Sequence, residues 1–250
     1  MWLFNQRFYG GYAMKTCRIV LLLFLMHVGL IGCDYSKKPE GVKELKEMNG
    51  LVGYWKFDGN AEDSSGNNNY GKWIGKESYS EDGVLGKAAY FDGISNYVSI
   101  PHSSSIDVGK GVFSFGAWVN SIGKKDGKNQ HFLNKRVGGQ GISWDMYLSG
   151  KVENINAEVA SDSLGNPQSN MKLYNWHHIL FTRGISGLTT VYIDGKPILS
   201  KNISGDSSNT HSFNIGNLAE DLTQGFNGLI DEVVVYNRAL SKEEVERLYR

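Results

Sequence analysis

Two groups of side chains in this sequence have the types and spacing to do chemistry. The first is a set of acids at the ends of short apolar runs: Asp58 and Asp92, each followed by glycine, and Asp231. Calcium takes six to eight oxygen ligands, mostly from carboxylates and carbonyls in loops, so these acids are candidate calcium ligands. Acids at turns also accept hydrogen bonds from backbone amides without any metal. Both interpretations stay open.

The second group is a pair of adjacent histidines, His177 and His178, which follow Trp176 in an apolar run. Successive side chains of a strand point to opposite faces of its sheet, so two adjacent imidazoles cannot readily bind one ion. We predict structural roles for both. A nucleophile motif such as G-x-S-x-G does not occur in the sequence.

A third candidate is a cysteine, in the segment Leu30-Ile31-Gly32-Cys33. It ends a nearly uncharged run, residues 19–31, that follows Lys15 and Arg18. As a helix this run would rise about 20 Å, too short to span a hydrocarbon core of about 30 Å and typical of a secretory signal peptide. The segment resembles the bacterial lipobox, in which signal peptidase II cuts before a cysteine whose thiol carries a diacylglycerol. The alternative is an ordinary signal peptide with an incidental cysteine.

These features predict a bacterial lipoprotein with three regions. Residues 1–32 are expected to be the signal peptide, 33–49 the lipidated cysteine with a polar tether, and 50–250 one domain. Met14 stands where such a leader begins, so residues 1–13 are either a misassigned start or a genuine extension. We expect the mature chain to be anchored by its lipid in the cell envelope, outside the cytoplasm, with the membrane leaflet left open.

Charge and composition narrow the class of protein. The chain has 26 Lys+Arg against 26 Asp+Glu, so it lacks the broad basic field of a nucleic-acid-binding protein. Removal of residues 1–32 takes away three basic residues and no acid, leaving a mature charge of −3. The 31 glycines, 4 prolines and 12% aromatic residues predict a turn-rich β protein. The two cysteines, Cys17 and Cys33, leave none for a disulfide within the domain.

The elements that must position these side chains are mostly strands. Short aromatic or β-branched runs separated by turn residues predict strands at 51–57, 88–91, 97–100, 112–120, 144–148, 154–160, 176–183, 189–193, 196–200 and 229–236. Alternation is clearest at 112–120, where Phe113, Phe115, Ala117 and Val119 share a face. Two antiparallel sheets packed face to face would bury these aromatic residues.

One helix is predicted, at the C-terminus. Ser241 and Glu244 have the spacing of a capping box, and Leu240 with Val245 has the spacing of a hydrophobic staple. Val245, Leu248 and Tyr249 then form an apolar stripe at helical spacing.

The order of these motifs resembles the LamG-like jelly-roll domains of the concanavalin A-like lectin/glucanase superfamily. The resemblance spans nearly all of residues 51–249 and rests on five segments in family order: 51–58 with 62–68, GKAAYFDGISNY, 113–119, NWHHILFTRGISGLTTVYIDGKP, and 213–216 with FNGLIDEVVVYNRALSKEEVERLY. It implies an all-β antiparallel sandwich with adjacent first and last strands. It also implies that Asp58, Asp92 and Asp231 lie near one edge, where several relatives bind structural calcium.

Enzymes of this superfamily carry acids at two-residue spacing on one strand, of the E-x-D-x-x-E type, so that two carboxylates flank a glycosidic bond. This chain departs from that pattern. Glu153 and Glu158 have no intervening acid, and Asp231 and Glu232 are adjacent, so they should face opposite sides of a sheet. We therefore expect a protein that is not an enzyme.

Sugar binding would need exposed aromatic rings on which the C–H faces of a sugar can stack. Trp73, Tyr79, Trp144 and Tyr147 are the candidates, although burial in the sandwich would account for them equally. The sequence predicts a non-catalytic, envelope-anchored module that binds glycan. A protein-interaction or adhesion module and a divergent glycoside hydrolase are the alternatives, and no ligand-binding residue is assigned.

Overall fold

The computed structural model describes residues 48–250 except 109–110, 125, 138–139, 150–153, 166–168 and 170. The predicted signal peptide, Cys33 and most of the tether lie outside the described residues, as does Glu153. None of the helices in the described part is both long and apolar enough to cross a membrane.

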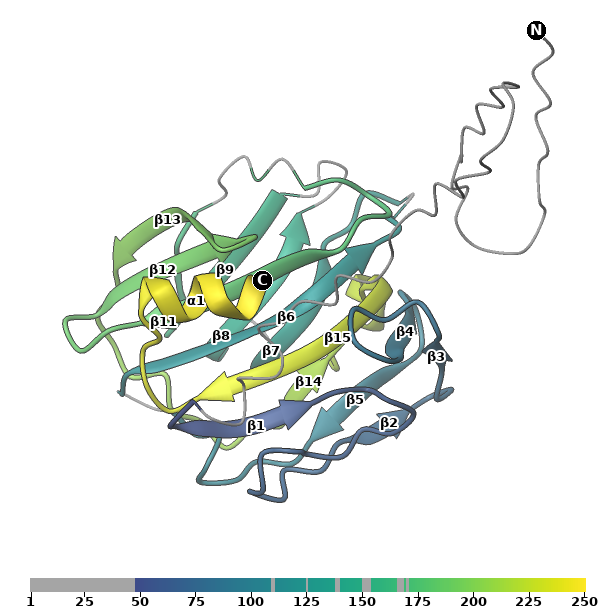
Figure 1. Cartoon of the computed structure of the whole chain (residues 1–250), viewed down its shortest axis with the longest axis horizontal. Coiled ribbons are helices and arrows are strands. Elements are labelled where there is room, and N and C mark those ends of the chain that lie inside the picture. The colour runs from purple at the N-terminus through teal and green to yellow at the C-terminus, as the bar shows by residue number, and fades with distance from the viewer. Residues whose placement is uncertain are drawn as a thin grey trace, which may run out of the picture. The chain divides into compact units, whose positions relative to one another are not determined.

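Two antiparallel sheets make up the domain (Figure 1). The first sheet has the order β13-β12-β11-β6-β15-β4-β3, with β1 also paired to β15. Its strands are β1 (Leu51–Trp55), β3 (Tyr79–Ser80), β4 (Ala88–Asp92), β6 (Phe113–Ser121), β11 (His177–Arg183), β12 (Leu188–Ile193), β13 (Lys196–Asn202) and β15 (Asn227–Tyr236). The predicted adjacency of the first and last strands is confirmed by the antiparallel pairing of β1 with β15.

The second sheet has the order β10-β9-β8-β7-β14-β5-β2. Its strands are β2 (Lys72–Ile74), β5 (Tyr97–Ile100), β7 (Gln130–Val137), β8 (Gln140–Ser149), β9 (Asn154–Val159), β10 (Asp162–Ser163) and β14 (Phe213–Ile215). The predicted all-β antiparallel sandwich is therefore confirmed. The ten predicted strands are present, 97–100 with the predicted bounds and the others with shifted ends, whereas β2, β3, β7, β10 and β14 were not predicted.

Aromatic side chains from the two inner faces meet in the core. Phe115 of β6 and Trp144 of β8 have ring centroids 4.2 Å apart, and Trp144 also contacts Phe213 of β14 at 4.6 Å. Trp55 of β1 reaches the same Phe213 at 5.3 Å. All four rings are fully buried, which accounts for the alternation seen in these strands.

The outer face of the first sheet is covered by helix α1 (Lys242–Tyr249), as Figure 1 shows. The predicted capping box is present: Glu244 N donates to Ser241 Oγ at 3.3 Å, and Ser241 N donates to Glu244 Oε2 at 2.8 Å. Val245 and Leu248 are buried against residues such as Leu180 of β11. Within the described residues no α-helix covers the outer face of the second sheet.

Candidate functional site: a polar cavity on the second sheet

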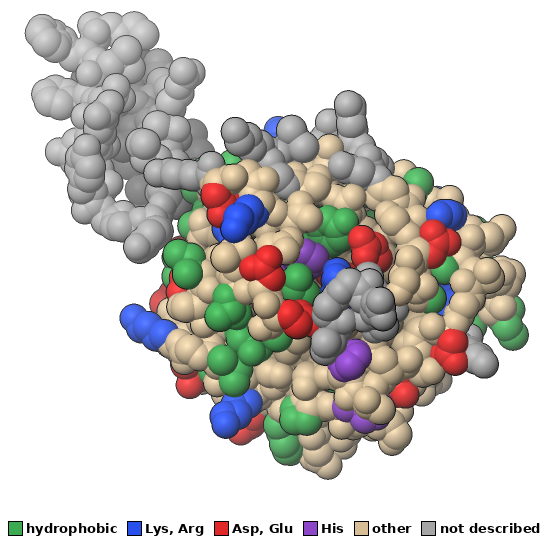
Figure 2. Space-filling model, turned by 180° about the vertical axis from the view of Figure 1, so that it is seen from behind, with side chains coloured by type: hydrophobic (Ala, Val, Ile, Leu, Met, Phe, Trp, Pro, Cys, Tyr) green, Lys and Arg blue, Asp and Glu red, His purple; other side chains and the backbone are tan. Residues whose placement is uncertain are grey.

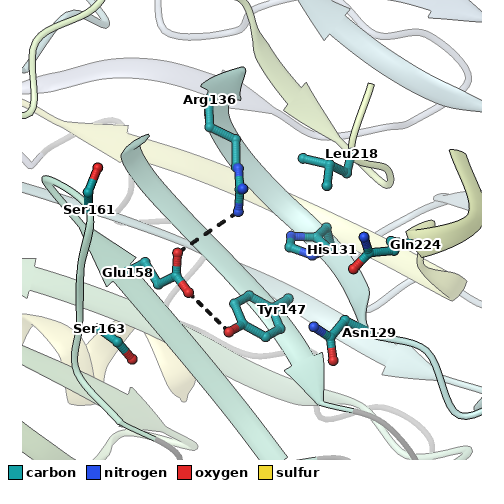
Figure 3. Close-up of a pocket in the computed structure, with 9 residues that line it drawn as sticks. All are labelled: Asn129, His131, Arg136, Tyr147, Glu158, Ser161, Ser163, Leu218 and Gln224. Atoms are coloured by element: carbon teal, nitrogen blue, oxygen red, sulfur yellow. Dashed lines mark hydrogen bonds and ion pairs between the residues drawn. The ribbon is translucent and has the colours of Figure 1, made fainter. Parts of the chain in front are cut away.

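A cavity of about 400 Å³ lies on the outer face of the second sheet (Figure 3). It is lined by residues of the strands and of the neighbouring loops and turns: Asn129, His131, Arg136, Tyr147, Glu158, Ser161, Ser163, Leu218 and Gln224. Figure 2 shows this side of the molecule, with acidic, basic and histidine side chains gathered on it. The volume falls in the range of small-ligand sites.

A β-bulge in β7 sets which side chains face the cavity. His131 pairs with Tyr147, but the next paired residue is Leu133, opposite Met146, so Phe132 is the extra residue. Phe132 and Leu133 are both fully buried in the core. His131 therefore pairs with Tyr147 and Asn134 with Asp145. The two β7 residues are three positions apart in the sequence, whereas their partners in β8 are two apart, because of the bulge.

Asp145 is buried behind two lining residues, His131 and Arg136, and forms the floor below them. It has no exposed surface, and its Oδ1 lies 2.9 Å from His131 Nδ1 while its Oδ2 accepts a hydrogen bond from Arg136 at 2.7 Å. Both carboxylate oxygens are thus occupied. A buried carboxylate needs such partners, because its charge is otherwise costly to remove from water.

Glu158 of β9 forms the more accessible acidic side, with 20% of its side chain exposed. Its Oε1 accepts a hydrogen bond from the Tyr147 hydroxyl at 3.1 Å, and its Oε2 lies 3.9 Å from Arg136 NH1. Burial first, and then the charge of Glu158, raise the pKa of Tyr147 well above its usual range. The phenol therefore stays protonated and acts as a donor to Glu158.

One aromatic surface lies beside these charges. The rings of Tyr147 and His131 stack with centroids 4.6 Å apart. Of the four aromatic residues proposed for sugar contact, Tyr147 alone lines this cavity. Trp144 is fully buried, and Trp73 packs on the core with its indole N–H donating to the Tyr79 hydroxyl at 2.8 Å.

The turn between β9 and β10 forms the rim. Its two central residues, Ala160 and Ser161, have φ values of 50° and 62°, in the left-handed region that glycine and asparagine favour. This strained turn carries Ser161 and Ser163 at the cavity edge.

The three acids proposed as calcium ligands are not gathered in one place. Asp231 Oδ2 accepts the amides of Val84 and Leu85, and Asp58 Oδ1 accepts the amide of Lys87, so both hold the loop before β4. Asp92 closes its own turn at the other end of β4.

In the part of the chain that the structure describes, no three His, Cys, Asp or Glu side chains could together hold a metal ion. The three carboxylates therefore do not fit one calcium site with this geometry. Calcium binding itself stays a prediction, to be tested by comparing melting curves in calcium and in EGTA.

The two adjacent histidines lie in different surroundings. His177 Nδ1 is 2.9 Å from Asp194 Oδ2, whereas His178 is buried beside Trp118, with ring centroids 5.2 Å apart. Burial lowers the pKa of His178 to about 4.

Sequence reasoning missed most of the cavity. Glu158 was considered only with Glu153, and His131, Arg136 and Asp145 were not singled out at all. A signal was present in β8, where Asp145 and Tyr147 alternate with the core residues Trp144, Met146 and Leu148.

Comparison with solved structures finds the same architecture in other proteins. Domain 4 of AbnA, a GH43 extracellular arabinanase from Geobacillus stearothermophilus, solved with arabinotriose, aligns with a TM-score of 0.62 and 23% identity, covering 80% of this chain and 98% of that one. The binding domain of Paraclostridial Mosquitocidal Protein 1 aligns with a TM-score of 0.65 and 21% identity, covering 80% of this chain and 52% of that one. Trypanosoma rangeli sialidase in complex with sialic acid aligns with a TM-score of 0.64 and 17% identity, covering 81% of this chain and 33% of that one.

At these identities the likeness shows the fold alone, and the chain spans only about half and a third of the latter two proteins. No curated protein sequence matches the chain. The family model Laminin_G_3, described as concanavalin A-like lectin/glucanases superfamily, matches residues 92–246. Because this match extends over more than half of the sequence and the structure has the two-sheet sandwich, the chain belongs to the concanavalin A-like lectin/glucanases superfamily.

Proposed function

We propose that this protein is a non-catalytic glycan-binding module, held at the bacterial envelope by a lipid on Cys33, and that it binds glycan in the cavity over β7, β8 and β9. The observation that carries the proposal is the cavity itself, in which the Tyr147 ring lies beside hydrogen-bonding groups of Glu158, Asn129 and Gln224. A ring next to polar groups matches the C–H faces and hydroxyls of a sugar.

Structural neighbours support a glycan as the ligand class. Two neighbours were solved in complex with sugars, arabinotriose in one and sialic acid in the other, which are a neutral and an acidic sugar. Toxin binding domains with the same fold also align.

The carboxylates of the cavity support a binding role without catalysis. Hydrolysis of a glycosidic bond normally needs two carboxyl groups flanking it, one as acid and one as base or nucleophile. Among the described residues, Asp145 is fully buried with both oxygens occupied, which leaves Glu158 as the accessible acid at the cavity.

A glycan array that includes arabinotriose and sialylated glycans tests the proposal with the whole chain. We expect retention by wild type and loss of it in Tyr147→Ala. The matched control is Tyr70→Ala, because Tyr70 is an exposed tyrosine, 52% accessible, in a loop outside the cavity. Melting temperatures of both variants show whether the fold is kept.

Three results would contradict the proposal. A blank array with a co-purifying envelope protein favours the protein-interaction alternative. Equal loss of binding in both variants places the site elsewhere. Release of reducing ends from any retained glycan, abolished by Glu158→Gln, favours the divergent hydrolase.

A further inference from the structure

The charges of the cavity are unevenly matched. Two carboxylates, Asp145 and Glu158, face a single guanidinium, that of Arg136, among the described residues of the cavity and its floor. The remaining lining groups are amides, hydroxyls, the ring of Tyr147, one leucine and His131. The carboxylates therefore outnumber the guanidinium by one.

Arg136 is already committed to the protein. It donates to Asp145 at 2.7 Å, lies 3.9 Å from Glu158, and exposes only 13% of its side chain. A sugar carboxylate would therefore compete with two protein carboxylates, Asp145 and Glu158, for the same guanidinium.

Among the described lining residues, Glu158 is the charged side chain that can accept hydrogen bonds from a ligand. Glu158 keeps 20% of its side chain exposed and carries a charge at the rim. Gln224 donates one amide N–H to Asp221 Oδ2 at 2.8 Å, which leaves its amide oxygen and its second N–H (Figure 3). A carboxylate such as that of Glu158 binds hydroxyl or ammonium donors and repels carboxylate or sulfate groups.

We propose that the cavity selects neutral or amino sugars and rejects acidic ones, with Glu158 as the residue that sets this specificity. The proposal rests on the glycan-binding function proposed above and specifies its ligand class. A sugar hydroxyl or ammonium donates to Glu158 while Arg136 stays paired with Asp145. A uronic acid, a sialic acid or a sulfated sugar meets the uncompensated negative charge.

The test is an array on which neutral glycans, glucosamine oligomers, and uronate, sialylated and sulfated glycans are immobilised at equal density. Whole chains of wild type, Glu158→Gln and Glu62→Gln are compared on it. Glu62, an exposed acid outside the cavity, is the matched control. We expect wild type and Glu62→Gln to retain neutral and amino glycans about tenfold or more over acidic ones, a factor that corresponds to about 1.4 kcal/mol.

Glu158→Gln keeps the shape of the side chain and removes its charge. We expect it to weaken retention of glucosamine oligomers about tenfold and to narrow the discrimination against acidic glycans. A second measurement, on wild type alone, does not depend on the folding of any variant: raising the salt concentration should narrow the same discrimination, because salt screens partly exposed charges.

The outcomes separate the two proposals. A blank array overturns glycan binding and this inference with it. Preferential retention of acidic glycans overturns the inference and leaves glycan binding standing. If the preference for neutral and amino glycans over acidic ones changes neither with salt nor in Glu158→Gln, then Glu158 does not cause that preference.

Discussion

Tyr54 and Glu232 form a buried pair that makes stability depend on pH. The Tyr54 hydroxyl donates to Glu232 Oε2, while Glu232 Oε1 has no hydrogen-bond partner among the described residues. Burial raises the pKa of Glu232 to about 7, and the bond from Tyr54 opposes that rise. A carboxyl whose folded pKa is raised contributes stability below its ordinary pKa of 4.5, and that contribution is lost as pH rises through about 7.

Tyr54→Phe removes the donor, so the pKa of Glu232 should rise further. We expect a loss of about 1–3 kcal/mol in the free energy of unfolding at pH 8 and a smaller loss at pH 5, where the carboxyl is protonated. Urea unfolding at both pH values measures the difference. Tyr70→Phe, at an exposed tyrosine, should show no such dependence. An equal loss at the two pH values would mean that the charge of Glu232 is not involved.

His178 acts in the opposite pH direction. Its folded pKa of about 4 lies below the ordinary 6.5, because the ring is buried beside Trp118 of the neighbouring strand β6, which stacks on Tyr249 of α1. The charge of Asp194 opposes the shift only in part. The unfolded chain therefore takes up a proton between pH 6.5 and 4 that the folded chain does not, and stability falls as pH falls through this window.

We expect His178→Phe to remove this part of the acid sensitivity, which amounts to about 3 kcal/mol across the window. Denaturant midpoints measured from pH 7 to pH 4 would show a flatter profile for the variant. His102→Gln, at an exposed histidine, is the control and should follow wild type. Parallel profiles for wild type and His178→Phe would show that His178 is protonated in the folded state.

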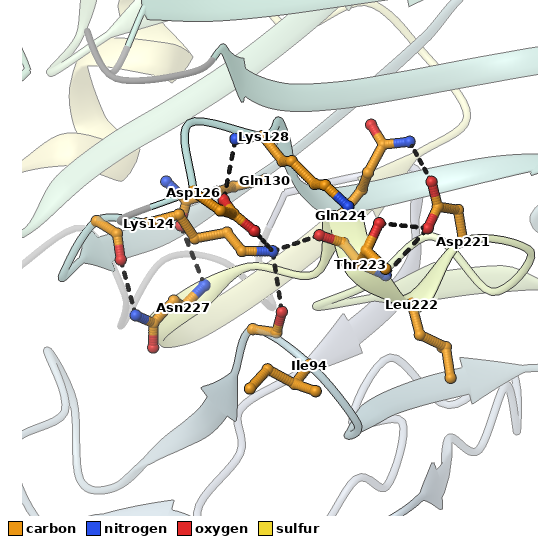
Figure 4. Close-up of polar contacts among 12 residues, drawn as sticks. Ile94, Lys124, Asp126, Lys128, Gln130, Asp221, Leu222, Thr223, Gln224 and Asn227 are labelled. Carbon is orange, nitrogen blue, oxygen red and sulfur yellow. Dashed lines mark hydrogen bonds and ion pairs between the residues drawn. The ribbon is translucent and has the colours of Figure 1, made fainter.

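At the scale of elements, one lysine joins three loops beside the cavity (Figure 4). Lys124, in the loop after β6, donates its ammonium to the carbonyl of Gly93 at 3.0 Å and to the carbonyl of Thr223. Thr223 belongs to the short helical turn η2 (Leu222–Gln224), whose last residue lines the cavity. The Lys124 side chain is only 9% exposed, and this burial lowers the pKa of its ammonium.

Lys124→Met should therefore loosen η2 and withdraw Gln224 from its position. Two carbonyls would lose a charged donor, and we expect a loss of about 1–3 kcal/mol in stability. Hydrogen exchange should become faster in residues 221–226, and glycan retention should weaken. Lys128→Met, at an exposed lysine of the same loop, is the matched control. Unchanged exchange in 221–226 would show that the turn holds its position without Lys124.

The strands that the sequence predicted are those in which local pattern and tertiary position agree. In β6 and in the C-terminal helix, alternation and capping chemistry point to the structure found. In β7 the local pattern does not indicate the strand, for two reasons. The bulge at Phe132 breaks the alternation of inward and outward side chains. Lys135 is fully buried at a position where an apolar residue would be expected. The cavity depends on that bulge, so its residues could not be assembled from spacing alone.

The three acids proposed as calcium ligands, Asp58, Asp92 and Asp231, also show how far local sequence can predict a site. The Asp-Gly pairs correctly placed Asp58 and Asp92 at turns, whereas Asp231, also expected at a strand end, lies inside β15. All three accept backbone amides. Which of them lie together depends on how β4 and β15 pair, a contact between residues far apart in the chain. The local sequence around each acid does not determine that register.

At the scale of the whole molecule, the two outer faces of the sandwich differ. Helix α1 covers the first sheet, and the second sheet carries the cavity. A module of this kind acts at a surface only if it is held there, and a mature chain of charge −3 is not attracted to anionic lipid by its own charge. The acyl chains proposed on Cys33 would have to supply that attachment.

Cys33→Ser tests the attachment, and Cys17→Ser, inside the predicted leader, is its matched control. We expect wild type and Cys17→Ser to incorporate a fatty-acid label and to fractionate with membranes, and Cys33→Ser to incorporate none. Mass spectrometry of the wild-type protein should find an N-terminus at Cys33 that carries a diacylglycerol. An unmodified Cys33 in an uncleaved chain would refute the lipid anchor, and the glycan-binding cavity would then have to reach its ligand without a membrane attachment at that cysteine.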